Sequence, residues 1–247
     1  MLVLPVSRRA VVLRAPGGSH ELSLAEAADP GTAAVAELLL DLAAPADGEP
    51  LNWYAMPLAD LQAALLGLRR LLEGDRIVSE IRCEACGAPV DLSFSIAEYM
   101  TAHAPRRVRG AVAEDDWYRI GSVRFRFPTV ADRIAASASP KPEETLRLAC
   151  VQGAGPDVRR AENALRRMCP LLADLLSGVC PECRRPVSVW FDPVTFVLAE
   201  MRERAAFVYR DIHLLASAYG WSETQILELP RARRMRYVEL LETGGVL

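Results

Sequence analysis

Cysteine is the residue type in this chain whose spacing most directly indicates chemistry. Four of the six cysteines form two Cys-x-x-Cys pairs, Cys83 with Cys86 and Cys180 with Cys183. A tight turn after the first cysteine of such a pair lets both sulfurs face one cation. Two such turns supply the four thiolates of a structural zinc site. We therefore expect these four cysteines to bind one zinc ion.

The residues that follow the two pairs are alike, which indicates that the pairs belong to one site. Each second cysteine is followed by two residues, then Pro-Val, then an alternating run typical of a strand, Val90–Phe94 or Val187–Phe191. The 93 residues of segment 87–179 separate the two pairs, against about 15 to 20 in a compact zinc ribbon. The alternative is two unrelated pairs, one of which is redox-active.

A closed set of four sulfur ligands leaves no coordination position for water or substrate, so we expect this zinc to be structural. Cys150 and Cys169 lie in apolar helical contexts and are expected to be small core residues. The histidines, His20, His103 and His213, are scattered, and no nucleophile or glycine-rich phosphate loop accompanies them. The sequence therefore predicts a protein that is not an enzyme. A zinc hydrolase remains an alternative that needs an open metal position and a nearby acid.

Composition favours a protein partner over nucleic acid. The chain has 247 residues, a net charge of −3 and a hydrophobic fraction of 51%, which is enough to bury a core. Three arginine clusters invite a nucleic-acid interpretation, but the overall acidity and the lack of interleaved aromatic residues favour ordinary solvated arginines. A zinc-ribbon nucleic-acid-binding regulator is kept as the alternative function. The clusters are Arg106/Arg107/Arg109, Arg159/Arg160/Arg166/Arg167 and Arg231/Arg233/Arg234/Arg236.

The N-terminal sequence lacks the ordered features of a signal peptide, and no apolar run approaches the roughly 20 residues of a membrane span. We therefore expect a cytoplasmic protein that can be incorporated into an injection particle and whose cysteines are thiols or metal ligands rather than disulfides.

Hydrophobic periodicity and capping signals predict the elements that position the cysteines. A capping box at Ser23–Glu26 is expected to start the first helix, and a break is expected at Asp29–Gly31. Strands are predicted at 3–14, 77–82, 90–94, 123–128 and 187–191. Further helices are predicted at 32–43, 57–73, 95–103, 143–152, 157–177 and 193–218, from Thr129, at 222–229 and from Pro230.

These elements predict an α+β fold, mainly helical, with a zinc-ribbon-like unit of two knuckles. We call each Cys-x-x-Cys turn a knuckle. The expected organisation is an N-terminal region (1–56), a first knuckle with flanking helices (57–104), a mostly helical insert (105–178), and a second knuckle with C-terminal helices (179–247). Segments 57–104 and 179–247 together would form the zinc unit.

The C-terminal segment 213–241 is dense in apolar and aromatic residues and forms either core or an interface; the residue pattern alone favours core. Its string His213–Pro230, followed by Arg233-Arg234 and Tyr237, resembles the C-terminal motif of the baseplate hub assembly proteins of T-even-like contractile phages. Similar zinc-knuckle proteins occur in bacterial contractile injection systems. Gly74–Ile77 and Phe125–Thr129 with Asp132 are also similar to parts of that family.

The resemblance implies a component or assembly chaperone of the baseplate of a contractile particle, with no catalytic residues and no small-molecule substrate. Its expected partners are hub or spike proteins. The candidate partner surface is His213, Tyr219, Trp221, Leu229 and Tyr237.

Overall fold

The computed structural model describes residues 1–27 and 31–243. Helices hold 49% of the chain and strands 20%, so the expectation of a mixed fold in which helix outweighs strand is confirmed. The chain divides into two compact units, which are described separately. Unit 1 comprises Met1–Leu13 and Thr32–Val194, and unit 2 comprises Arg14–Gly31 and Thr195–Leu247. The break predicted at Asp29–Gly31 has its first two residues outside the described residues.

The core of unit 1 is built around helix α3 (Leu58–Glu73), which buries side chains on almost every side, as its leucine and alanine content favours. It contacts α2 (Thr32–Leu42), α4 (Ile96–Ala102), α5 (Val130–Ser137) and strand β2 (Ala10–Leu13). Strand β2 pairs on one edge with β1 and on the other with β3. The remaining elements here are β1 (Leu2–Val3), β3 (Ala43–Pro45) and the 3-10 helix η1 (Trp53–Ala55).

Two buried polar side chains of α3 tie loops to the core. Both carboxylate oxygens of Asp60 accept backbone N–H groups, from Val6 at 2.8 Å and from Ser7 at 2.9 Å. The Gln62 side-chain oxygen accepts the N–H of Leu172 at 2.9 Å. Since each buried polar group finds a partner, these contacts fix the loops without leaving an unsatisfied group on the helix.

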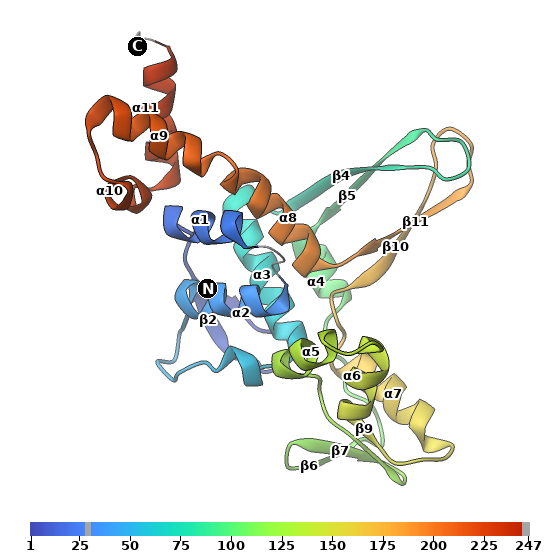
Figure 1. Ribbon diagram of the computed structural model, residues 1–247. Coiled ribbons are helices and arrows are strands. Elements are labelled where there is room, and N and C mark those ends of the chain that lie inside the picture. The colour runs from blue at the N-terminus through green and yellow to red at the C-terminus, as the bar shows by residue number, and fades with distance from the viewer. Residues whose placement is uncertain (28–30, 244–247) are drawn as a thin grey trace. The chain divides into compact units, whose positions relative to one another are not determined.

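Two antiparallel hairpins project from the helices of unit 1 and meet at their tips (Figure 1). The first consists of β4 (Arg76–Arg82) and β5 (Pro89–Ser95), and the second of β10 (Asp174–Val179) and β11 (Pro186–Phe191). Each hairpin turns through a Cys-x-x-Cys knuckle. The elements that follow the knuckles therefore have the strand character that the alternating residues predicted.

The two hairpins differ in one of their faces. Because side chains alternate along a strand, Arg76, Glu80 and Arg82 share a face with Asp91 of the paired strand. The corresponding exposed face of β10–β11 is uncharged. It carries Leu175, 54% exposed, beside its cross-strand partner Trp190, 63% exposed, and Val179 further along.

The segment between the hairpins contains a four-stranded antiparallel sheet. Only its third strand was predicted from the sequence. The strand order is β6-β7-β8-β9, and helix α7 contacts β7, β8 and β9. Phe125 and Val151 from the sheet pack with Ala161 and Ala164 of α7 in one apolar cluster. The elements of this segment are β6 (Val112–Glu114), β7 (Trp117–Ile120), β8 (Val123–Phe125), β9 (Val151–Gln152), α6 (Pro142–Cys150) and α7 (Asp157–Met168).

Unit 2 joins a short N-terminal segment to the C-terminal helices. Helix α1 contacts α9 and α10, and α9 contacts both α10 and α11. Leu215, Ile226 and Val238 form the buried centre of these C-terminal helices. The helices are α1 (Gly18–Glu26), α8 (Pro193–Ala205, whose first two residues belong to unit 1), α9 (Val208–Tyr219), α10 (Glu223–Glu228) and α11 (Arg231–Glu242).

Three predicted helices differ from those in the structure. Helix α1 begins at Gly18, not at Ser23, because the backbone N–H of Gly17 donates a hydrogen bond to the ring Nδ1 of His20 and so caps the earlier start. Helix α7 ends at Met168 instead of 177, since Pro170 cannot donate a backbone bond and disfavours helical geometry at Cys169. The helix predicted at 193–218 is interrupted between Ala205 and Val208, where the sequence has neither glycine nor proline.

Most of the other bounds agree with the prediction. Thr129 caps α5 and Ser222 caps α10, each in a capping box. Gly220 ends α9 in a left-handed conformation with φ 68°. Among the described residues, no helix is long and apolar enough to cross a membrane.

Candidate metal centre

The structure brings the four predicted cysteines together at the meeting point of the two hairpin tips. Their Sγ atoms all lie within 4.8 Å of one another. The Sγ atoms of Cys83 and Cys183 are 3.7 Å apart, and those of Cys86 and Cys180 are 3.8 Å apart. The convergence of the two distant pairs, predicted from their flanks, is therefore confirmed.

These sulfur distances match a four-thiolate metal site. A tetrahedral zinc ion with Zn–S bonds of about 2.3 Å places its sulfurs about 3.8 Å apart. A disulfide requires an S–S distance of about 2.05 Å, and all four thiols are free. The four cysteines are close enough to hold one metal ion, and four thiolates are the donor set that soft or borderline cations such as zinc prefer.

The two knuckles have the same backbone geometry. In the first, the N–H of Cys83 donates to Ala88 at 2.9 Å and the N–H of Gly87 donates to Cys83 at 2.8 Å. In the second, Cys180 donates to Arg185 at 2.9 Å and Arg184 donates to Cys180 at 3.0 Å. Each bond therefore has its counterpart at the same offset in the other knuckle.

The matched turns impose a left-handed backbone at one position of each knuckle. Gly87 has φ 74° and Arg184, the equivalent residue, has φ 61°. Glycine adopts this region freely, whereas a residue with a Cβ atom is strained there. The second knuckle therefore carries a local strain that the first avoids.

Backbone N–H groups prepare one of the thiols for ionisation. The N–H groups of Ala85 and Cys86 lower the pKa of Cys83 to about 7. For Cys86, the N–H of Ala88 lowers the pKa, but the thiols around it and burial raise the pKa to about 12. A cluster of four thiols thus does not hold four negative charges without a cation, which is the electrostatic reason for a metal ion there.

Aromatic rings join the hairpins at the end opposite the cysteines. Phe94 and Phe191, each the eighth residue after the second cysteine of its knuckle, contact each other edge to face with ring centroids 5.2 Å apart. Tyr99 of α4 packs against both rings, and its hydroxyl donates to the carbonyl of Leu172 at 2.9 Å. The hairpins are therefore connected at their bases by rings and at their tips by sulfurs.

The two other cysteines are buried away from the cluster. Cys150 ends α6 and is 1% exposed, and Cys169 follows α7 and is 2% exposed. Burial raises the pKa of Cys150 to about 11 and that of Cys169 to about 12, so both stay protonated. They occupy the core positions that the sequence predicted.

The structure brings three of the five candidate partner residues together. The rings of Tyr219 and Trp221 stack with centroids 4.9 Å apart, and Tyr237 contacts Trp221 edge to face at 5.1 Å. Tyr219 is 41% exposed. His213 is exposed on α9, and Leu229 is half-buried between α10 and α11. Neither belongs to this ring trio.

A buried ion network in unit 2 was missed by sequence reasoning. The guanidinium of Arg234, 1% exposed, donates to Asp211 at 3.0 Å and to Glu21, and Arg231 pairs with Glu21 at 3.0 Å. The network fastens helix α1 to α9 and α11. No local sequence pattern predicts this network, because Glu21 lies more than two hundred residues from Arg234 in the chain.

The segment Phe125–Thr129 with Asp132, singled out by the resemblance, forms a clamp at the start of α5. Arg126 binds both carboxylate oxygens of Asp132, at 2.6 and 2.7 Å, and Asp132 closes a capping box with Thr129. The N–H of Leu58 donates to Pro128 at 2.8 Å. Burial would raise the pKa of Asp132, but Arg126 and Thr129 lower it on balance.

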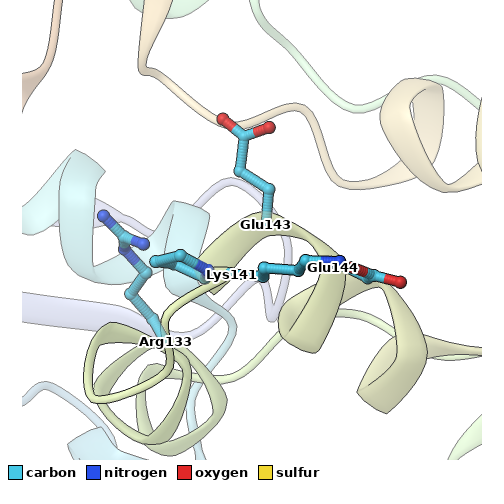
Figure 2. Close-up of a pocket in the computed structure, with 5 residues that line it drawn as sticks. Arg133, Lys141, Glu143 and Glu144 are labelled. Carbon is cyan, nitrogen blue, oxygen red and sulfur yellow. Dashed lines mark ion pairs between the residues drawn. The ribbon is translucent and has the colours of Figure 1, made fainter.

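An open hollow at the start of α6 is lined by five residues, none of them a cysteine (Figure 2). It contains two cations and two acids, and Lys141 pairs with Glu144 at 3.1 Å. The lining residues are Arg133, Lys141, Pro142, Glu143 and Glu144.

Comparison of the chain with protein-family models, with curated proteins and with solved structures finds no match.

Proposed function

We propose that the chain is a non-enzymatic, zinc-stabilised component or assembly chaperone of the baseplate of a phage-tail-like contractile injection particle. The observation that carries the zinc part is the convergence of Cys83, Cys86, Cys180 and Cys183 at distances that suit one tetrahedral ion. The resemblance of the C-terminal residues supports the baseplate part.

Zinc is proposed over other cations because all four donors are thiolates. Carboxylates and carbonyls, which magnesium and calcium require, are missing from the ligand set. With all four positions filled by sulfur, the ion has no place for a water molecule. Its role in the proposal is therefore to fasten the two hairpin tips rather than to activate a substrate.

The ring trio Tyr219, Trp221 and Tyr237 is proposed as the partner surface. Aromatic side chains bury large area at low entropic cost, and Trp and Tyr are enriched among residues that dominate binding energy. Tyr219 leaves much of its ring exposed while Trp221 and Tyr237 hold it in place. A hub or spike protein of the particle is the proposed partner.

The metal part is tested by loading the metal-free protein with Co²⁺, which reports on its ligands through its visible spectrum. We expect one ion per chain and the intense absorption of a tetrahedral four-thiolate site. A weak spectrum, typical of oxygen ligands or of an open position with water, would remove the closed-site proposal.

The partner part is tested by co-expressing the chain with hub and spike subunits and measuring what co-purifies. Trp221→Ala and Tyr219→Ser are expected to reduce recovery of the partner about tenfold or more. Trp190→Ala, which removes an exposed tryptophan from β11, is the matched control and is expected to change nothing. If all three variants recover the partner equally, the ring trio is not the contact surface. If wild type recovers none of these subunits, the baseplate role is wrong.

A further inference from the structure

The three arginine clusters of the sequence differ in how many of their arginines form ion pairs in the structure. In the C-terminal cluster, Arg231 and Arg234 pair with Glu21, and Arg236 pairs with Glu239. That cluster is largely neutralised by its own unit. The other two clusters lie in unit 1, in the loop at 106–109 and on α7.

The loop and α7 lie side by side. The N–H of Arg106 donates to the carbonyl of Arg167 at 2.7 Å, which fixes the start of the loop at the end of the helix. Val108 packs into the same apolar cluster as Ala161 and Ala164 of α7. The loop arginines, whose side chains are exposed, are thereby held next to those of the helix.

Most of these arginines lack a carboxylate partner. The two acids of α7 are already engaged, Asp157 by Arg160 at 2.8 Å and Glu162 by Arg147 at 3.6 Å. Within residues 1–27 and 31–243, six exposed arginines of the two segments make no ion pair, and we call them the arginine face. They are Arg106, Arg107, Arg109, Arg159, Arg166 and Arg167.

Helix α7 contributes no apolar anchor to the arginine face. The exposed residues of α7 are four arginines and Asn163, while its apolar residues point into the core. Protein interfaces place aromatic or aliphatic groups at their centre, and single-stranded nucleic acid is held by exposed aromatic platforms. A surface of unpaired guanidinium groups alone suits the phosphates of a duplex, which guanidinium binds in a bidentate manner.

We propose that the arginine face binds the phosphate backbone of duplex DNA without reading its sequence. From Arg159 to Arg167 the helix extends about 12 Å, and on each strand of a duplex one phosphate recurs about every 3.4 Å of the duplex axis, so the arginines of α7 can reach several phosphates. This inference is independent of the proposed baseplate role. It revises the expectation from the net charge of −3, because that sum conceals where the unpaired charges lie.

The test is fluorescence anisotropy with a labelled mixed-sequence duplex and the metal-loaded full chain. If the six arginines each contact a phosphate, the affinity of wild type falls about 2000-fold between roughly 50 and 200 mM salt. In Arg159→Gln/Arg166→Gln/Arg167→Gln, with half the contacts, it falls only about 40-fold over the same range. The matched control is Arg202→Gln/Arg233→Gln/Arg236→Gln, which removes the same charge from exposed positions elsewhere.

We expect the control to keep the wild-type salt dependence. Equal losses in both triple variants would mean that only net charge matters, and would overturn the proposal. So would the absence of binding at low salt, or binding to an acidic polypeptide such as polyglutamate in place of the duplex. Circular dichroism checks that each variant is folded. If the helix variant is not, Arg106→Gln/Arg107→Gln/Arg109→Gln removes the other half of the face and replaces it in the comparison.

Discussion

The Sγ atom of Cys83 lies 3.7 Å from that of Cys183, although one hundred positions separate the two residues in the chain. The equivalent contact, Cys86 with Cys180, has almost the same length. Cys83 is equivalent to Cys180 and Cys86 to Cys183, so exchanging the two knuckles turns the first contact into the second. Together with the Phe94–Phe191 contact, this indicates that the hairpins are two copies of one design arranged around an approximate two-fold axis.

Removing one thiolate is expected to abolish metal binding and to destabilise unit 1. A cross-link that closes a loop of roughly 100 residues stabilises a protein by about 4 to 5 kcal/mol. We expect Cys83→Ser to lower the free energy of unfolding by a comparable amount and to retain no zinc by mass spectrometry. Cys150→Ser is the control, with zinc retained and an ordinary core cost of about 1 to 3 kcal/mol. Equal unfolding curves with and without a chelator would contradict the prediction.

The strained Arg184 offers a stabilising substitution. Because its φ of 61° suits glycine, Arg184→Gly is expected to stabilise the metal-loaded protein by about 1 kcal/mol. Gly87→Ala, at the equivalent position with φ 74°, is expected to destabilise it by a similar amount. Denaturant unfolding of both variants measures these changes. If the free energy of unfolding changed in the same direction in both variants, the left-handed backbone would not be what determines the preferred residue at these two positions.

Adjacent residues of β11 are expected to behave oppositely. Phe191 is 4% exposed and packs on Phe94 and Tyr99, so Phe191→Ala should cost about 3 to 5 kcal/mol. Trp190 is 63% exposed, so Trp190→Ala should change stability by less than about 0.5 kcal/mol. Thermal unfolding of the two variants is the measurement. A larger effect at Trp190 would mean that the exposed face of this hairpin is covered in the folded protein.

The Arg126–Asp132 clamp predicts a pH-dependent contribution. The folded-state pKa of Asp132 is lowered from 3.8, so its stabilisation is present above the unfolded value and is lost as pH falls through the folded one. Asp132→Asn is expected to cost about 1 to 2 kcal/mol at neutral pH. The difference between variant and wild type should shrink below pH 3.8. A gap that stays constant on acidification would show that the carboxylate charge is irrelevant.

The cysteine cluster was predictable because its signal is carried by residue types and matching flanks. The strands β6, β7 and β9 were not, since they are short and their pairing partners are set by tertiary contacts. The end of α7 had a signal, Pro170, that the helical spacing of Leu172 and Leu175 outweighed. The burial of Arg234 against Glu21 had none, because pairing across such a separation leaves no local pattern.

The uncharged face of the second hairpin has a consequence for the solubility of the metal-free protein. A two-stranded ribbon has unpaired edges, and charged side chains are one means by which proteins keep such edges from adding strands of other molecules. The charged side chains of β4–β5 hinder such association of the first ribbon. The exposed face of β10–β11 has no charged side chain and carries the apolar residues Leu175, Val179 and Trp190 instead. Once a chelator frees its tip, we expect the second ribbon to self-associate, so that aggregation accompanies loss of zinc and increases with protein concentration.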